Sequence, residues 1–196
     1  MKVYRTSEVL AGGRYEVGDI VRYTLETGEE VEAIAVKEEY IGNYEPCMTF
    51  MLLDCLNDTC RMNRDDTNEG GYEKSYLREW LDKECIEKFP FAMRMNMIPF
   101  ENGDLLSIPT EREIFGQNIY GEEEPDTVEQ FEPMKKRRNR LASDGLNGGY
   151  QYYWLKNKRV RSATAFCDVY YGGCATNLGA SNSVGVRPLY RLRNYR

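Results

Sequence analysis

The 196-residue sequence contains no histidine. This absence excludes Ser-His-Asp and Cys-His catalysis, together with metal centres that depend on imidazole ligands. General acid–base chemistry would fall to Asp, Glu, Lys, Tyr or Cys side chains with shifted pKa values. We therefore expect a protein that is not an enzyme and that uses no catalytic residue and no cofactor.

Long apolar segments and an excess of basic charge are also missing. No apolar run approaches the ~20 residues that a membrane span needs, and the N-terminal residues lack the apolar core of a signal peptide. These features predict a cytoplasmic protein with no membrane partner, and a virion-associated protein released by lysis would share them. The net charge of −6, from 32 acidic and 26 basic residues, argues against nucleic acid as a partner.

The six cysteines include no C-x-x-C pair. Cys55 and Cys60 lie five positions apart, and Cys167 and Cys174 lie seven apart, which are weak spacings for a metal site. Disulfides are not favoured without an export signal. We predict free, partly buried thiols and no metal site.

Length and patterning predict a single α+β domain over residues 1–196, with residues 1–16 as a leader segment. Alternating or short apolar runs predict strands at residues 19–25, 31–36, 49–53 and 105–108. The run at 49–53 is continuously apolar, so we place it centrally in the sheet. From Tyr150 onward the sequence is predicted to form strands and loops.

A helix is predicted from Glu73 to Pro90, where the proline ends it. Its apolar face recurs at three- and four-residue steps, at Leu77, Trp80, Leu81 and Cys85. A second, short helix is predicted after Thr110, because Thr110 and Glu113 have capping-box spacing and Gly116 provides a stop.

Two charged segments follow one another. Residues 121–133 are acidic and contain two prolines, so we predict an exposed loop. Residues 135–140 are basic, and such a run can mark nucleic-acid contact. Because the acidic loop can neutralise it, we interpret the basic run as a solvated helix face.

Five segments occur in an order that carries a family resemblance. They are Leu52-Leu53-Asp54-Cys55, Ser75-Tyr76-Leu77-Arg78-Glu79-Trp80-Leu81, Leu105-Leu106-Ser107-Ile108-Pro109-Thr110-Glu111, Tyr153-Trp154-Leu155 and Val184-Gly185-Val186-Arg187-Pro188. Over residues 17–192 the chain resembles the bacterial and prophage family called domain of unknown function 6273. The resemblance implies a C-type-lectin-like fold with short antiparallel strands, two or three helices and long loops, related to the formylglycine-generating enzymes. The family commonly has W-L-R-S-P at the segment that here begins with Trp154, so the following loop is expected to differ.

The candidate ligand surface lies in the late loops, at Tyr152, Tyr153, Tyr170, Tyr171, Asn177 and Asn182. Tyrosine supplies rigid aromatic area and asparagine supplies adaptable hydrogen bonding, as in known binding loops. The resemblance implies that these loops form the ligand face. We predict a non-catalytic module that binds a protein or a glycan there, or a phage-associated structural part. Structural roles are predicted for Trp80, Trp154 and Arg187, the last because a guanidinium can tie several loops together.

Two further chemistries are alternatives. Formylglycine-generating enzymes hold copper with two nearby cysteines, so the resemblance implies Cys167 and Cys174 as the pair for a copper-dependent thiol oxidase. Their spacing differs from the C-x-x-x-x-C pattern of those enzymes. Glu124-Pro125-Asp126 is similar to the E-P-N or Q-P-D motif of calcium-dependent lectins, but calcium needs six to eight oxygens and no W-N-D segment follows.

Overall fold

The structure, a computed structural model, describes residues 3–4, 13–42, 45–146 and 148–195. It contains two sheets and several short helices, which confirms the predicted α+β class. The chain forms two compact units, each assembled from separate segments. The first unit comprises Met1–Leu53, Leu81–Ser107 and Pro188–Arg196, and the second comprises Asp54–Trp80 and Ile108–Arg187.

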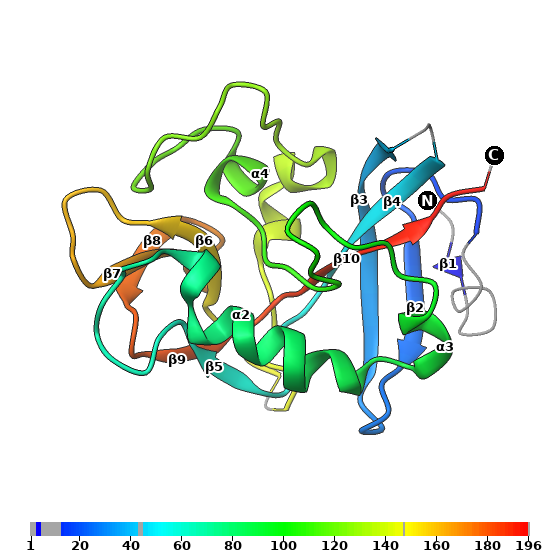
Figure 1. The fold of residues 1–196 in the computed structure, drawn as a ribbon, viewed down its shortest axis with the longest axis horizontal. Coiled ribbons are helices and arrows are strands. Elements are labelled where there is room, and N and C mark those ends of the chain that lie inside the picture. Colours follow the sequence, from blue (N-terminus) through cyan, green and yellow to red (C-terminus); the bar gives the residue numbers. More distant parts are fainter. Residues whose placement is uncertain (1–2, 5–12, 43–44, 147, 196) are drawn as a thin grey trace. The chain divides into compact units, whose positions relative to one another are not determined.

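The first unit contains a five-stranded sheet in the order β1-β2-β3-β4-β10. Its strands are β1 (Val3–Tyr4), β2 (Ile20–Thr24), β3 (Glu30–Ile41), β4 (Glu45–Leu52) and β10 (Leu189–Arg193). β1 pairs with β2 in parallel, and the other neighbours are antiparallel. Its helical segments are η2 (Leu81–Cys85), η3 (Ile86–Lys88) and α3 (Phe91–Arg94). Figure 1 shows β10, from the C-terminal end of the chain, beside β4.

The core of the first unit is aromatic. β4 lies between β3 and β10, which confirms the central position predicted from its apolar run. Phe50 of β4 is fully buried and stacks on Tyr190, with 5.4 Å between ring centroids. Tyr23 and Phe89 approach the Tyr190 ring at 6.1 Å and 5.7 Å. Each such pair adds about 0.5–1.5 kcal/mol beyond area burial, so the cluster joins β2, β4, β10 and the end of η3.

The segment predicted as a leader falls mostly on residues 1–2 and 5–12, which lie outside the described residues. Its last part packs in the core. Tyr15 is buried and meets the Phe50 ring edge-on at 4.9 Å.

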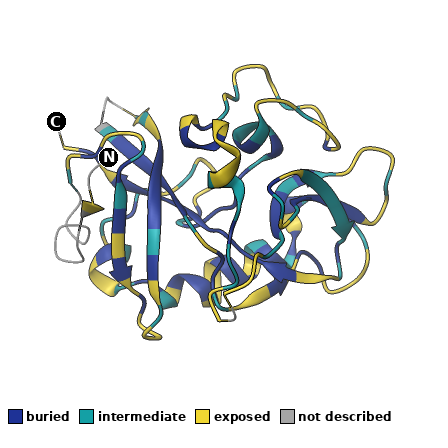
Figure 2. Ribbon diagram, turned by 180° about the vertical axis from the view of Figure 1, so that it is seen from behind, coloured by how far each residue is buried: buried dark blue, intermediate teal, exposed yellow. Residues whose placement is uncertain are grey.

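The second unit contains a five-stranded sheet in the order β5-β9-β6-β7-β8. Its strands are β5 (Thr59–Arg61), β6 (Tyr153–Lys158), β7 (Ala165–Val169), β8 (Ala175–Gly179) and β9 (Ser183–Gly185). In this sheet β6 and β9 pair in parallel. The β5–β9, β6–β7 and β7–β8 pairs are antiparallel. Its helical segments are η1 (Tyr72–Lys74), α2 (Tyr76–Trp80), α4 (Glu111–Phe115), η4 (Glu132–Lys135) and η5 (Arg137–Arg140). Figure 2 shows that buried residues gather in the strands, and β7 is buried along its whole length.

The predicted helix from Glu73 to Pro90 is present, but it is broken into short segments. η1, α2, η2 and η3 follow one another between Tyr72 and Lys88, and η2 is a π-helical turn. The predicted apolar face is buried, at Leu77, Trp80, Leu81 and Cys85. The 3.6-residue pattern therefore located the buried face correctly, although it did not reveal the changes of helix type.

The strand predicted at 105–108 is wrong. Only an isolated bridge forms there, between Ser107 and Leu189. Pro109 has no N–H to extend the ladder. The predicted capping box is confirmed: the Thr110 side chain accepts from the Glu113 N–H at 3.3 Å, and Glu113 Oε2 accepts from the Thr110 N–H at 2.7 Å.

Candidate functional site

Three tyrosine side chains meet at the turn between β7 and β8. The Tyr170 ring centroid lies 3.7 Å from that of Tyr171 and 5.0 Å from that of Tyr152. Tyr152 also approaches Tyr171 at 5.4 Å, nearly perpendicular to it. These three residues, hereafter the tyrosine cluster, are all among those selected from the sequence.

Backbone pairing explains why the tyrosine cluster forms. Tyr153 pairs with Val169 in the β6–β7 ladder, so the preceding Tyr152 lies opposite Tyr170, which follows Val169. The turn after Tyr170 is tight, because the Gly173 N–H donates to the Tyr170 carbonyl at 2.7 Å. Gly173 has a φ of 75°, a left-handed conformation that favours glycine.

The tyrosine cluster is accessible from solvent. Tyr171 is 44% exposed, and Tyr152 and Tyr170 are half-buried. Hydrogen bonding to Tyr171 is the main cause that raises the pKa of Tyr170 to about 12. A tyrosine hydroxyl is protonated at neutral pH, and this shift keeps that of Tyr170 protonated to higher pH, so it can donate as well as accept. Exposed aromatic groups with a polar tip are typical of recognition surfaces.

The tyrosine cluster has a cationic neighbour that the sequence did not connect with it. Arg137 Nε donates to the Gly172 carbonyl at 2.9 Å. A Cβ at Gly172 would lie 3.2 Å from the Tyr170 ring and 3.6 Å from Arg137 Nη2, so the ring and the guanidinium flank the same position. The basic run predicted as a solvated face thus supplies one exposed guanidinium to this surface. No local pattern indicates a contact between residues 35 positions apart.

Tyr153 does not belong to this surface, which corrects the expectation. Its side chain is 0% exposed, and its hydroxyl donates to the Arg140 carbonyl at 2.9 Å. The Arg187 guanidinium lies over its ring at 4.7 Å. Burial raises the pKa of Tyr153 to about 12, against the opposing effect of Arg187. Successive strand side chains point to opposite faces, so Tyr153 points inward where Tyr152 points outward.

The residues selected for structural roles lie in the interior. Arg187 is fully buried and donates to the Asn139 carbonyl at 3.3 Å, which joins it to η5. Trp154 is also fully buried, and its Nε1 donates to the Cys60 carbonyl at 2.9 Å. Trp80 is 7% exposed. None of these three side chains is available to a ligand on the surface.

The two selected asparagines lie away from the tyrosine cluster. Asn177 is in the middle of β8 and accepts from Arg159 Nη1 at 3.0 Å. Asn182 follows β8, and its Nδ2 donates to the Gly179 carbonyl at 2.9 Å. The turn that carries Tyr170 and Tyr171 precedes β8, and Asn182 follows β8. The length of β8, roughly 16 Å, therefore separates this turn from Asn182. The six selected residues therefore do not form one surface.

The cysteine pair of the oxidase alternative is not formed. Cys167 pairs with Asn177 in the β7–β8 ladder, whereas Cys174 lies in the turn before β8. Three positions of extended chain separate their levels, or roughly 10 Å. Burial, followed by the charge of Glu111, raises the pKa of Cys167, which disfavours the thiolate that copper(I) binding requires. All six cysteines are described and free, and Cys174 is the exposed one.

The acidic motif at residues 124–126 is engaged with nitrogen donors. Glu124 Oε2 accepts from the Arg112 N–H at 3.1 Å and from Asn157 Nδ2 at 2.9 Å. Asp126 forms an ion pair with Arg112 Nη1 at 3.1 Å. Within the described ranges, no group of three or more His, Cys, Asp or Glu side chains could hold a metal ion. These two carboxylates stabilise the loop beside α4.

One buried carboxyl group in β7 lacks a partner. Asp168 is 0% exposed, and neither of its oxygens has a hydrogen-bond partner among the described residues. It pairs in register with Trp154 and Thr176. Burial raises the pKa of Asp168 from 3.8 to about 7. Residues two apart share a sheet face, so Asp168 lies one step inward from Tyr170.

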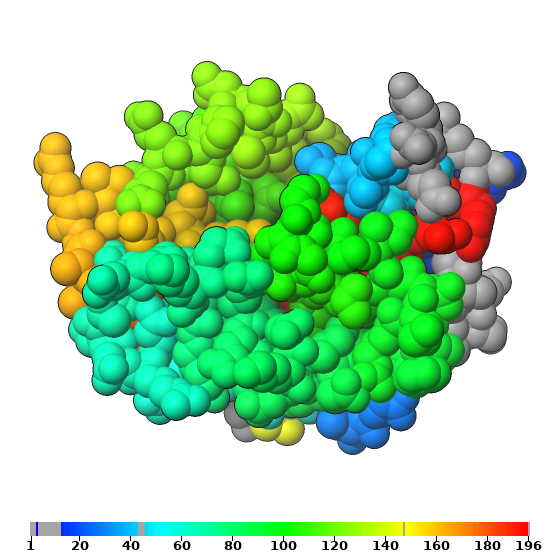
Figure 3. Space-filling model, in the orientation of Figure 1, coloured from blue at the N-terminus to red at the C-terminus, as the bar shows by residue number. Residues whose placement is uncertain are grey.

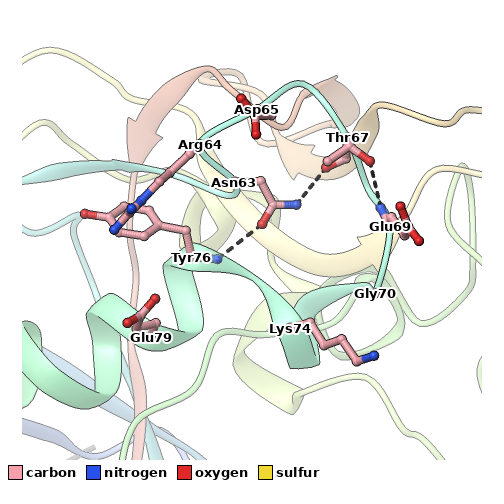
Figure 4. Close-up of a pocket in the computed structure, with 9 residues that line it drawn as sticks. All are labelled: Asn63, Arg64, Asp65, Thr67, Glu69, Gly70, Lys74, Tyr76 and Glu79. Carbon is pink, nitrogen blue, oxygen red and sulfur yellow. Dashed lines mark hydrogen bonds between the residues drawn. The ribbon is translucent and has the colours of Figure 1, made fainter.

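The second unit also contains a pocket of about 620 Å³. It is formed by the loop after β5 together with η1 and α2, and Figure 3 shows this segment at the surface, coloured cyan to green. Its lining is polar (Figure 4): Asn63, Arg64, Asp65, Thr67, Glu69, Gly70, Lys74, Tyr76 and Glu79. The sequence predicted only a loop and a helix start here, because neither signal indicates a concave surface.

Comparisons of the chain with family models, curated proteins and solved structures give no match. Over the described ranges, none of the helices combines the length and the apolar character that a bilayer crossing requires.

Proposed function

We propose that this protein is a non-catalytic ligand-binding module that holds a glycan against the tyrosine cluster. The observation that carries the proposal is the convergence of three partly exposed tyrosine rings beside the Arg137 guanidinium. Tyrosine rings pack against the apolar faces of sugars, and their hydroxyls pair with sugar hydroxyls. Arg137 adds hydrogen-bond donors and a positive charge, which suits a glycan that carries a carboxylate.

The arrangement of the tyrosine cluster supports binding at low entropic cost. A tyrosine side chain has only two χ angles to fix, and here each ring already contacts the other two. Gly173 and the Arg137–Gly172 hydrogen bond hold the turn that carries two of the rings. The entropic cost of fixing these side chains when a ligand binds is therefore smaller.

We also propose that the fold is C-type-lectin-like and that the chain is related to the family called domain of unknown function 6273. Support comes from the five ordered sequence segments, and the α+β character with two sheets is compatible with it. In that family resemblance the late loops form the ligand face, and the tyrosine cluster lies in those loops. A phage-associated structural part that attaches through this surface is the related possibility within the same proposal.

Glycan-array binding by the full chain, followed by calorimetry with the best glycan, tests this proposal. Tyr152→Ala, Tyr170→Ala and Tyr171→Ala should each weaken binding roughly tenfold, because one aromatic contact contributes about 1 kcal/mol or more. Tyr150→Ala is the matched control, since Tyr150 is 65% exposed and makes none of the cluster contacts; its affinity should stay within about twofold of the parent.

Three results would contradict the proposal. Loss of the folded circular-dichroism signal in the cluster variants would show that the rings are core. Unchanged glycan affinity in those folded variants would place the site elsewhere. An array without binding would leave a protein as the ligand class, since tyrosine-rich loops also serve protein recognition.

The salt dependence of the affinity distinguishes a nucleic-acid ligand from a glycan. Arginine beside aromatic rings also suits single-stranded nucleic acid, so oligo-dT should be titrated at 50 mM and 200 mM salt. Tight binding that falls steeply with salt would replace the glycan assignment. We expect weak binding, because the net charge is −6.

A further inference from the structure

Strand β8 forms one edge of the sheet in the second unit, because the strand order ends on it after β7. All five of its residues are partly exposed (Figure 2). Edge strands are commonly protected from pairing with another chain by charged residues, by proline or by a bulge. The β8 sequence Ala-Thr-Asn-Leu-Gly contains no charge and no proline, and the strand pairs with β7 without a register shift. Its own residues therefore offer no obstacle to a further strand.

The hydrogen-bond pattern defines which main-chain groups of β8 point outward. Before the strand, the Cys174 carbonyl accepts a hydrogen bond from the β7 side at 2.8 Å, and after it the Ala180 N–H donates one to that side at 2.8 Å. In an antiparallel ladder every second residue bonds to the neighbouring strand. The N–H and C=O groups of Ala175 and Asn177 therefore point away from β7. Within the described ranges, these main-chain groups bond to no other segment.

A guanidinium lies against this edge. Arg159 is exposed, and its Nη1 donates to Asn177 Oδ1 at 3.0 Å. Among the residues that the structure describes, no carboxylate forms an ion pair with Arg159. A guanidinium has five N–H donors, so the bond to Asn177 leaves donors for a carboxylate.

The position of Arg159 favours an acidic strand over a second copy of this chain. Residues directly opposite each other in an antiparallel pair lie on the same face of the sheet, so a residue that pairs with Asn177 would project beside Arg159. In a symmetric pair of β8 strands centred on Asn177, two Arg159 guanidiniums would meet and repel each other. A glutamate in the same place would instead form a charge-assisted hydrogen bond.

We propose that β8 binds an extended, acidic segment of a protein partner as an additional antiparallel strand, with a glutamate of the partner opposite Asn177 and beside Arg159. In this mode of recognition the main-chain hydrogen bonds supply affinity, and side-chain contacts supply specificity. Binding at this edge does not depend on the glycan proposal.

Nuclear magnetic resonance titration of the full chain with the peptide acetyl-Ser-Val-Glu-Val-Ser-amide tests the proposal. The amide protons of Ala175 and Asn177 should shift in a saturable way and gain protection from hydrogen exchange, because they acquire acceptors. Those of Thr176 and Leu178 face β7, so their protection should change less. Lysine in place of the peptide's glutamate should weaken binding at least about tenfold, because attraction to Arg159 becomes repulsion.

N-methylation tests the main-chain pairing without changing the charge of the peptide. In the proposed register, the N–H of the peptide's glutamate points to β8, and those of its two valines point away from β8. Methylation of the glutamate nitrogen should therefore weaken binding at least about tenfold, because it removes a donor and blocks the approach of the strands. Methylation of the first valine nitrogen is the matched control and should leave most of the affinity.

A pair of protein variants assigns the charge contact. Arg159→Gln should remove the preference for the glutamate peptide over the lysine peptide. Arg161→Gln is the matched control, because it removes the same charge from the same loop at an exposed position. This variant should keep the preference.

Four results would overturn the proposal. One is the absence of saturable shifts in β8 up to about 20 mM peptide, well above a millimolar dissociation constant. The second is equal affinity for the glutamate and lysine peptides, and the third is full affinity after methylation of the glutamate nitrogen. The fourth is protection of the Asn177 amide that rises with protein concentration in the absence of peptide, since it would show that a second copy pairs with β8.

Discussion

The buried carboxyl of Asp168 should make the stability of this protein depend on pH. The side chain has no exposed area and no hydrogen-bond partner among the described residues. Its pKa is raised from 3.8 to about 7 by burial. Between these values the unfolded chain ionises Asp168 while the folded chain keeps it protonated. The folded state therefore loses stability as pH rises through this window, and below pH 3.8 the difference disappears.

The magnitude follows from the two pKa values. At about 1.4 kcal/mol per pH unit, the interval from 3.8 to about 7 corresponds to roughly 4 kcal/mol. This is a large share of the 5–15 kcal/mol that is typical of folded domains. Because the sequence has no histidine, no imidazole titrates in the same window and obscures the effect.

Asp168→Asn isolates this contribution, because the amide has nearly the same shape and cannot ionise. Urea unfolding at pH 4 to 8 should show the variant gaining on the parent by about 1.4 kcal/mol per pH unit, with the gain levelling off near pH 7. Asp65→Asn is the control, since Asp65 is exposed, and its curve should run parallel to that of the parent. If the Asp168→Asn and parent curves also run parallel from pH 4 to 8, Asp168 is solvated or partnered and the reasoning fails.

Two further predictions concern Arg187 and the cysteines. Arg187→Met should cost about 2–4 kcal/mol in urea unfolding, because the Asn139 carbonyl loses its donor and the Tyr153 ring loses the guanidinium; a loss below about 0.5 kcal/mol would show that the contacts are replaceable. In the native protein, Ellman's reagent should modify Cys174 rapidly and Cys167 only after denaturant is added, since Cys174 is exposed and Cys167 is fully buried. Rapid native reaction of two or more thiols would contradict the buried positions.

Local sequence patterns were sufficient to predict the positions of several elements. Alternation located β2 and β3, the apolar run located β4, and the spacing of Thr110 and Glu113 identified the cap of α4. These signals act over a few residues, so they can be read without knowledge of the rest of the chain. The strand expected at 105–108 does not form, because a strand needs a partner strand in register. Here Ser107 alone pairs, in an isolated bridge with Leu189.

Composition also selected the tyrosines of the cluster, but it did not separate Tyr152 from Tyr153. In β6 the residues Tyr153, Trp154 and Leu155 are all buried. Where both faces of a strand are covered, the two-residue period no longer distinguishes inside from outside. Only the β6–β7 register sets Tyr152 beside Tyr170 and directs Tyr153 to Arg187.

The absence of histidine is a property of composition, and it excluded imidazole-dependent catalysis and metal binding before any fold was known. Tertiary structure decided which polar groups are left to act. Among the described residues Asp168 has no hydrogen-bond partner, whereas Glu124 Oε2 accepts from three nitrogen donors. Arg64 lines a pocket, whereas Arg187 is buried. The physical reason is that hydrogen bonding and desolvation depend on groups distant in the chain, which come together only when the sheets form.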